Sequence, residues 1–330
     1  MKKFILAVIL MFLFMLPVFA DNDKVDEVIK KADSGEVNAQ KTLGAMYFNG
    51  KDVPQDYKKS FEWFEKAAAQ GDAGAQVKLG FMYCKGNGVP KDTKKAFEWF
   101  EKAAVQGNAA AQIKLGSMYG EGTGVPKDAK KAFEWTEKAA VQGDASAQAF
   151  LGTKFFFGNG VPKDTKKAFE WIEKAAVQGN ANAQAFLGGK FLFGTDTPKD
   201  IKKAFEWFEK AAVQGYAPAQ IQLGSMYDDG NGVPQDAKKA FEWYEKAALQ
   251  GEADAQIKLG SMYGEGNGVP KDCVMSYAYY NVAATDGRED AIKIRNMLEG
   301  QMAPSQIEKA QEASRELFKK IEENKISGQK

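Results

Sequence analysis

The sequence predicts an all-α solenoid built from tandem helix–turn–helix repeats. A stretch close to VPKDTKKAFEWFEKAAVQG, residues 89–107, returns every 36 residues along a chain of 330 residues. All six tryptophans occupy one position of this repeat, and seven of the ten prolines occupy another. These tryptophans are Trp63, Trp99, Trp135, Trp171, Trp207 and Trp243. A fixed period of this length is typical of solenoids, in which each repeat packs mainly on its neighbours.

The net charge and the absence of histidine exclude several classes of function. The formal charge is +1, and it falls to −1 without residues 1–20, which carry Lys2 and Lys3. A balance this even gives no indication of binding to nucleic acid or to an anionic membrane. The sequence contains no histidine, which excludes Ser-His-Asp triads, Cys-His pairs and most zinc sites. We therefore expect a non-enzymatic protein with no catalytic residues, no metal site and no cofactor.

The two cysteines are too far apart along the predicted solenoid to form a disulfide with each other. Cys84 and Cys273 are separated by about five repeats, and packed helices lie roughly 8–10 Å apart. A disulfide needs Cα atoms within about 7 Å. We expect two unpaired thiols with no assigned role, and pairing between molecules remains the alternative.

Residues 1–20 have the pattern of a secretory signal peptide. Lys2 and Lys3 precede an apolar run from Phe4 to Leu16, and Val18-Phe19-Ala20 ends in the small-x-small pattern of a cleavage site. The alternative is an uncleaved membrane anchor, but the run is short for the roughly 20 residues that a spanning helix needs. We expect cleavage after Ala20, no membrane span afterwards and a periplasmic or secreted monomer.

Seven repeats are predicted over 36–287, each with two helices joined by a Gly-rich turn. Their ranges are 36–71, 72–107, 108–143, 144–179, 180–215, 216–251 and 252–287. In the second repeat the first helix is expected over about 72–85, with Asp72 as N-cap and Gly86 as a left-handed C-cap. Asp92 is the expected N-cap of the second helix.

The apolar spacing of the second repeat predicts how its helices pack. The first helix is expected to bury Ala75, Leu79 and Tyr83. The second is expected to bury Ala96, Trp99, Ala103 and Ala104. A glycine inside a helix costs up to about 1 kcal/mol, so the recurrence of Gly80 in every repeat indicates a close approach of a neighbouring helix. Glu98 and Lys102 are spaced for an ion pair on the outer face.

The ends of the repeat array are predicted to be closed by additional helices. Residues 21–35 align with the second half of a repeat and are expected to form an N-terminal capping helix. Residues 288–330 hold a degenerate half-repeat and then an amphipathic stretch from Ser305 to Glu323. We interpret that stretch as a C-terminal capping helix.

The repeated residues resemble a known family. The run AQ-x-x-LG-x-MY-x-x-G-x-GVP-x-D-x-x-KAFEW-x-EKAA-x-QG is similar to the Sel1-like repeat, a subclass of the tetratricopeptide-repeat superfamily, over about 36–287. The resemblance implies a right-handed α/α superhelix whose first helices line a concave face. It also implies a protein-interaction adaptor or scaffold, and its secreted bacterial members are associated with host interaction.

A second branch of the same family supplies an alternative function. Its cysteine-rich secreted members resemble penicillin-binding proteins or weak β-lactamases and carry a disulfide-bonded pair in nearly every repeat. Only Cys84 and Cys273 are present here, so the hallmark of that branch is missing.

The positions at which the repeats differ predict a partner-binding surface. By superfamily resemblance, residues 74, 77, 81, 84 and 85 and their counterparts lie on the concave side. The predicted partner-binding residues are Phe156, Phe157, Leu192, Phe193, Thr153, Gly189, Phe81, Asp228 and Asp229. The first four would form an apolar floor and the two aspartates, with Glu121, an acidic flank. An apolar helix or peptide with a basic flank is the expected partner.

The same residues allow a purely structural interpretation. The pair Lys78 and Met82 of the second repeat becomes Phe150 and Lys154 in the fourth repeat, and Phe186 and Lys190 in the fifth. These two repeats are near-copies of each other, so their phenylalanines are not independent observations. The alternative is that Phe150, Phe156, Phe157, Phe186 and Phe193 simply fill the space between helices.

Overall fold

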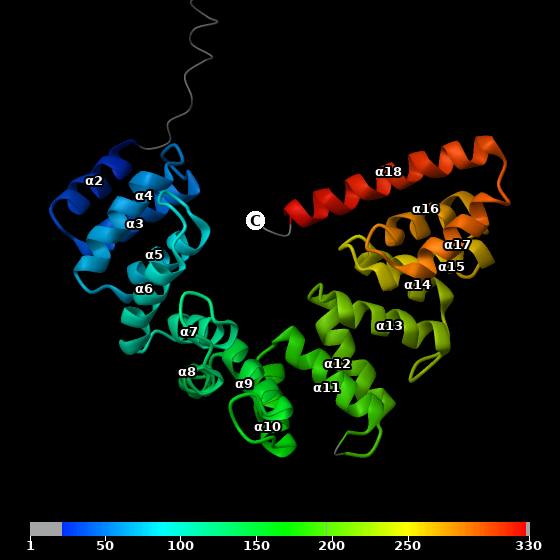
Figure 1. The fold of residues 1–330 in the computed structure, drawn as a ribbon, viewed down its shortest axis with the longest axis horizontal. Helices are drawn as coiled ribbons and strands as arrows, with labels where there is room; N and C mark the ends of the chain where they lie inside the picture. Colours follow the sequence, from blue (N-terminus) through cyan, green and yellow to red (C-terminus); the bar gives the residue numbers. More distant parts are fainter. Residues whose placement is uncertain (1–21, 196, 328–330) are drawn as a thin grey trace, which may run out of the picture. The chain divides into compact units, whose positions relative to one another are not determined.

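The computed structural model describes residues 22–195 and 197–327, and every regular element in these ranges is a helix (Figure 1). Tandem helical hairpins follow one another along the chain, so the predicted all-α solenoid of helix–turn–helix repeats is confirmed. The predicted signal peptide, 1–20, lies outside the described residues. The chain divides into two compact units. Unit 1 comprises the residues up to 147 with 158–162, and unit 2 comprises 148–157 and the residues from 163 onward.

Unit 1 holds α2 (Asn22–Asp33), α3 (Val37–Asn49), α4 (Tyr57–Ala69), α5 (Ala73–Lys85), α6 (Thr93–Val105), α7 (Ala109–Glu121) and α8 (Ala129–Val141). Unit 2 holds most of α9 (Ala145–Phe157), then α10 (Thr165–Val177), α11 (Ala181–Phe193), α12 (Ile201–Val213), α13 (Ala217–Asp229), α14 (Ala237–Ala248), α15 (Ala253–Glu265), α16 (Cys273–Ala284), α17 (Glu289–Glu299) and α18 (Pro304–Ser327).

The predicted capping residues begin and end the helices. The Asp72 side chain accepts a hydrogen bond from the Ala75 amide at the start of α5. Asp92 accepts from the amides of Lys94 and Lys95 at the start of α6. Gly86 ends α5 in the left-handed region, with φ of 77°. These contacts satisfy backbone groups that a helix terminus leaves without partners.

A glycine in the first helix of each hairpin brings the second helix close. A Cβ on Gly80 would lie 2.7 Å from the Phe100 ring, and one on Gly224 would lie 2.6 Å from the Tyr244 ring. The close approach predicted from Gly80 is therefore confirmed, and the neighbour is the second helix of the same hairpin. Phe100 is fully buried while Trp99 is only half-buried, so the prediction of a buried Trp99 was wrong.

Each of these tryptophan rings instead lies beneath the ammonium group of a lysine from the same second helix. The Lys102 ammonium lies 4.1 Å from the centre of the Trp99 ring, and Lys174 lies at the same distance over Trp171. A cation over an indole ring is held by the ring quadrupole. Lys102 thus lies over the ring of Trp99, three residues before it on the same helix. The predicted ion pair between Lys102 and Glu98 does not form.

Buried glutamines join neighbouring hairpins within each unit. The Gln76 amide donates to the Ala68 carbonyl at the end of α4, and its oxygen accepts from Gln106 at the end of α6. The donor and acceptor positions repeat every 36 residues. The glutamine pairs are Gln70–Gln40, Gln106–Gln76, Gln142–Gln112, Gln178–Gln148, Gln214–Gln184 and Gln250–Gln220. We call this set the glutamine ladder, and it satisfies polar groups that burial would otherwise penalise.

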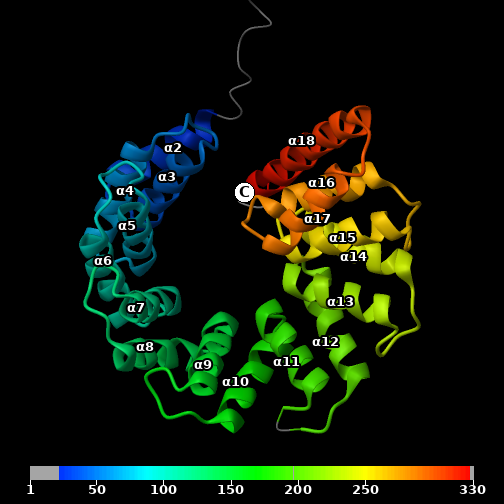
Figure 2. The same cartoon turned by 45° about the vertical axis from the view of Figure 1, so that its right-hand side comes forward.

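Additional helices pack at both ends of the array. In unit 1, α2 packs against α3. In unit 2, α16 contacts both α17 and α18, and α18 lies along α16 in both views (Figures 1 and 2). The buried residues of α18 are Ala310, Ser314, Leu317 and Ile321.

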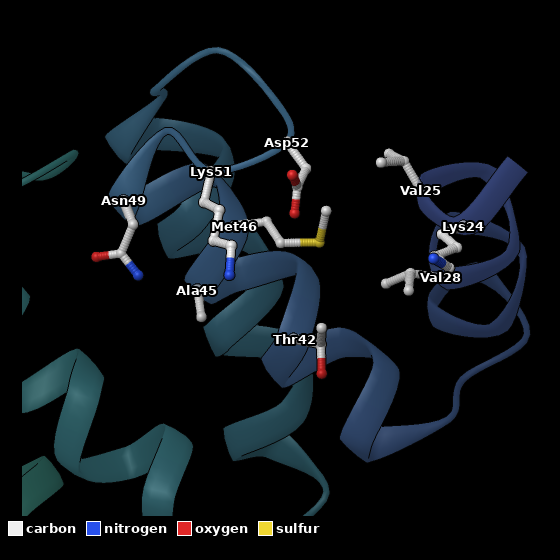
Figure 3. A pocket seen from close by; sticks show the side chains of 9 residues that line it. All are labelled: Lys24, Val25, Val28, Thr42, Ala45, Met46, Asn49, Lys51 and Asp52. Carbon is white, nitrogen blue, oxygen red and sulfur yellow. The ribbon is translucent and has the colours of Figure 1, made fainter. Parts of the chain in front are cut away.

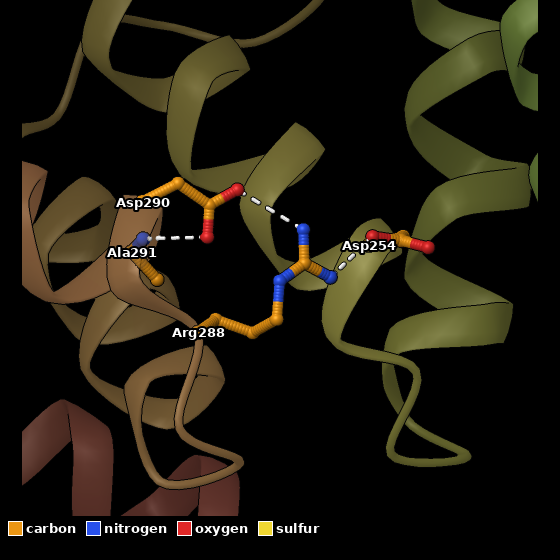
Figure 4. A network of polar contacts seen from close by, with 4 residues as sticks. All are labelled: Asp254, Arg288, Asp290 and Ala291. Atoms are coloured by element: carbon orange, nitrogen blue, oxygen red, sulfur yellow. Dashed lines mark hydrogen bonds and ion pairs between the residues drawn. The ribbon is translucent and has the colours of Figure 1, made fainter.

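One arginine fastens α17 to the hairpin before it. The Arg288 guanidinium donates to Asp254 of α15 and to Asp290 of α17, and Asp290 also accepts from the Ala291 amide (Figure 4). The hydrogen bond from Arg288 holds the pKa of Asp290 below its ordinary value. The same two carboxylates raise the pKa of Arg288.

The glutamine ladder ends at an unpaired acceptor, which predicts a stabilising substitution. The buried Gln256 oxygen has no hydrogen-bond partner, because Asp286 stands where a ladder glutamine would donate. We expect Asp286→Gln to raise the free energy of unfolding by about 0.5–1.5 kcal/mol, measured by urea denaturation. Asp286→Ala is the control for simple loss of charge. Equal stability of the two variants would contradict the ladder explanation.

The Arg288 network predicts a dependence of α17 on acid pH. Because the folded pKa of Asp290 is depressed, its contribution is complete above the ordinary Asp pKa of about 3.9 and is lost as pH falls below that value. We expect hydrogen exchange at the Ala291 amide to lose protection over this acid range in the wild-type chain. In Arg288→Ala, part of that protection should already be absent at neutral pH. Identical protection in the two proteins would show that the network is dispensable.

Candidate functional site

Three phenylalanines of unit 2 are exposed on two first helices. Phe150 and Phe157 of α9 are 54% and 65% exposed, and Phe193 of α11 is 79% exposed. Among the described residues, no other phenylalanine is among the large apolar side chains that reach the solvent. Exposed aromatic residues gathered on neighbouring elements are typical of binding surfaces, whereas single ones are ordinary.

Phe156 lies between these exposed residues and takes part in the packing of unit 2. Its ring centre lies 5.1 Å from that of Phe157, 5.1 Å from Phe186 and 6.0 Å from Phe169, in edge-to-face arrangements. Phe156 and Phe186 are half-buried and belong to a cluster with buried Phe169. The two interpretations of these phenylalanines therefore apply to different residues. Phe156 and Phe186 pack between helices, and Phe157 and Phe193 face the solvent.

A small open pocket lies against this aromatic cluster. Its volume is about 300 Å³. It is lined by Phe156 of α9, Phe169 of α10, the loop residue Thr195, and four residues of α11, namely Phe186, Gly189, Lys190 and Phe193. We call it the phenylalanine pocket. Ligand pockets usually begin at about this size, so it has room for an amino-acid side chain rather than a large cofactor.

Gly189 keeps the pocket open. A Cβ built on this residue would meet no atom within 4 Å, whereas one on the adjacent Gly188 would lie 2.8 Å from the Phe208 ring. The counterpart of Gly189 in the second repeat is Phe81, whose ring packs edge to face on Phe100 at 5.2 Å. The repeat therefore accepts a large side chain at this position, and the fifth repeat leaves it out.

Lys190 brings a positive charge to a position that is methionine in all the other repeats except the fourth, which has Lys154. Its counterparts Met82, Met118, Met226 and Met262 are all buried. The Lys190 ammonium lies 4.0 Å from the centre of the Phe169 ring. The exchange of methionine for lysine is visible in the sequence, but Lys190 was not among the predicted site residues. The neighbouring counterpart Lys154 is half-buried, and burial lowers its pKa.

The remaining predicted site residues lie outside the phenylalanine pocket. Thr153 donates its hydroxyl to the Phe150 carbonyl, and Leu192 packs against the apolar cluster around Phe208. Phe81 belongs to unit 1. Asp228 accepts from Asn267 of the next hairpin, and Asp229 accepts from Ser225 on its own helix, so both carboxylates already have hydrogen-bond partners.

The serines that recur on the first helices are held by carboxylates. Ser117, Ser225 and Ser261 donate to Glu121, Asp229 and Glu265 at 2.8, 3.1 and 2.7 Å. A carboxylate four residues away fixes each hydroxyl. Cys84 and Cys273 are both free, and burial raises the pKa of the Cys84 thiol. Among the described residues, no three carboxylate or thiol side chains come together as a possible metal site.

A larger cavity lies at the N-terminal end of unit 1. It has a volume of about 710 Å³, with Val25 and Val28 of α2 facing Met46 of α3 (Figure 3). Residues of α2, of α3 and of the loop after α3 line it. The cavity therefore lies between α2 and the first hairpin. None of the helices described in the structure has the length and apolar character that a membrane span requires.

Comparisons with known proteins identify the repeat. The family model of the Sel1 repeat matches seven consecutive segments, 37–72, 73–108, 109–144, 145–180, 181–216, 217–252 and 253–287. A crystal structure of a Sel1 repeat protein from Oxalobacter formigenes is similar, with a TM-score of 0.70 and 36% sequence identity. The similarity covers 84% of this chain and 82% of that one.

Two similar proteins come from Escherichia coli. The secretory immunoglobulin A-binding protein EsiB of strain O6:H1 (CFT073) is 40% identical over 70 residues, which are 20% of this chain and only 14% of EsiB. A protective antigen present in uropathogenic strains has a TM-score of 0.41 at 28% identity, over 90% of this chain and 87% of that one.

The adjacent glycines of α11 predict opposite effects of the same substitution. Gly188→Ala should lower the free energy of unfolding by about 1–3 kcal/mol, because the new methyl group would overlap the Phe208 ring. Gly189→Ala should raise it by about 0.5–1 kcal/mol, because the methyl group enters open space and alanine favours the helix. Thermal and urea unfolding of the two variants measure both effects. Destabilisation by Gly189→Ala would show that the pocket is not open.

Proposed function

Because the chain belongs to the Sel1 repeat family, we propose that it is an exported, non-enzymatic scaffold that binds a protein partner through α9 and α11. Sel1 repeat proteins generally act as protein-interaction scaffolds. The observation that carries the proposed surface is the exposure of Phe157 and Phe193 beside the phenylalanine pocket. Burying one such ring on binding contributes roughly 1.5–3 kcal/mol.

Export and host contact form part of the proposal. The pattern of residues 1–20 supports export to the periplasm or beyond the cell. EsiB, which is similar to part of this chain, is a secretory immunoglobulin A-binding protein. A host protein is by analogy a suitable class of partner for this chain.

The alternative function, a penicillin-binding protein or weak β-lactamase, receives less support. The resemblance connects that activity with a disulfide in nearly every repeat, whereas both cysteines of this chain are free thiols. The recurring serines are fixed by carboxylates rather than placed beside a lysine base. A scaffold is therefore the function that the site favours.

An affinity experiment tests the proposed surface with variants chosen by exposure. The bait is the chain from residue 21 onward, incubated with envelope and host-cell extracts. Phe157→Ser/Phe193→Ser removes two exposed rings and leaves Phe156 in its packed cluster. Val177→Ser/Val213→Ser is the matched control, because these valines are 74% and 68% exposed on the second helices α10 and α12. Circular dichroism verifies that each bait is folded.

We expect the wild-type and valine baits to retain one partner that the phenylalanine bait loses. If all three baits retained the partner equally, the scaffold function would still be supported, but the binding surface would lie outside α9 and α11. No retained protein on the wild-type bait would contradict the scaffold function itself.

A further inference from the structure

The phenylalanine pocket has a positive charge at its wall and no acidic residue in its lining. Lys190 lies over the Phe169 ring at 4.0 Å, and Lys163 lies over the Phe156 ring at 5.7 Å. No carboxylate of the described chain lies within ion-pair distance of Lys190. Glu170 and Glu173 line a neighbouring cavity that also includes Lys190, but they do not line the phenylalanine pocket.

The position of Lys190 makes this charge unusual for the repeat. Methionine at the equivalent position is buried in four other repeats. A lysine there exchanges a buried apolar group for an ammonium that is held against an aromatic ring without an anion. An ammonium held against an aromatic ring is well placed to form a charge-assisted hydrogen bond with an incoming carboxylate.

The carboxylates expected from the sequence to attract a basic partner are engaged elsewhere. Asn267 donates to Asp228 at 3.2 Å and Ser225 donates to Asp229 at 3.1 Å, and neither aspartate lines the pocket. Glu121 belongs to unit 1 and accepts from Ser117. The charges that lie over rings of the pocket are thus the two lysines, which are complementary to an acidic rather than a basic flank.

We propose that the phenylalanine pocket binds a peptide segment with one large apolar side chain beside an Asp or Glu. The apolar side chain enters the space that Gly189 leaves open, between Phe156, Phe186 and Phe193. The carboxylate accepts a hydrogen bond from the Lys190 ammonium. This inference rests on the proposed scaffold function and specifies the chemistry of its partner.

The chain offers substitutions that separate the parts of this proposal. Lys190→Met restores the residue found in most other repeats and removes only the charge. Lys154→Met makes the same change in the preceding repeat, at a residue that does not line the pocket. Gly189→Phe introduces the residue that the second repeat already carries as Phe81, and it fills the pocket.

The experiment selects peptides without assuming a partner. A random peptide library displayed on phage is selected on the chain from residue 21 onward. Enriched peptides are synthesised, and their affinities for the wild-type chain and the three variants are measured by fluorescence anisotropy. We expect enriched sequences to place Phe, Leu, Ile, Met or Trp next to Asp or Glu. Gly189→Phe should abolish their binding, Lys190→Met should weaken it about tenfold, and Lys154→Met should leave it unchanged.

Three outcomes would overturn the proposal. Enriched peptides with Lys or Arg beside the apolar residue would contradict the proposed preference for an acidic residue. Peptides that bind Gly189→Phe as tightly as the wild-type chain would place binding outside the pocket. The absence of any enriched sequence would remove the pocket as a peptide site, while the affinity experiment with cell extracts would still decide the scaffold function independently.

Discussion

The close contact between a glycine of the first helix and a side chain of the second determines the geometry of each hairpin. The residue opposite the glycine varies widely in size, from Thr136 to Phe208 and Tyr244, whereas the glycine is constant. The distance between the two helices is therefore set by the missing Cβ and the backbone behind it. Because every hairpin has this contact, hairpins of nearly equal shape follow one another along the chain, and the first six each hold one pair of the glutamine ladder. Because only the glycine position must stay constant, other positions of the first helix can accept different residues.

The candidate site lies at such variable positions of the first helix. In α11, Gly188 is required by the packing of the hairpin, whereas a Cβ on the next residue, Gly189, would meet no atom within 4 Å. Phe186 and Phe193, which lie near it, stand where the other repeats, except the fourth, carry polar or charged residues. Apolar groups thus reached the surface while the contact between the glycine and the second helix was kept. A repeat protein can acquire a binding surface in this way at a small cost in stability, because the glycine contact and the exposed rings occupy different positions of one helix.

The sequence predicted most of the fold, because a period of 36 residues supplies seven versions of the same local signal. Helix termini, caps and the role of Gly80 could all be predicted from turn and capping chemistry. Which of Trp99 and Phe100 is buried could not be predicted, since the two residues are adjacent on the helix and only the packing of the partner helix distinguishes them. The glutamine ladder was also missed, because buried polar residues have the same apparent periodicity as exposed ones. For the site, Phe156 and Phe157 are adjacent and chemically identical, and only their positions around α9 separate a packed ring from an exposed one.

The glutamine ladder has a consequence for how a chain of this kind can lengthen. Each pair of the ladder lies within one hairpin, and the bond to the preceding hairpin runs from a glutamine amide to a backbone carbonyl, as from Gln76 to Ala68. A backbone carbonyl is present whatever the side chain, so a duplicated hairpin brings its own glutamine pair and needs only a carbonyl from its predecessor. Asp286 leaves the seventh pair incomplete without removing such a carbonyl. Lengthening by duplication therefore places no demand on the side chains of the neighbouring repeat at this contact.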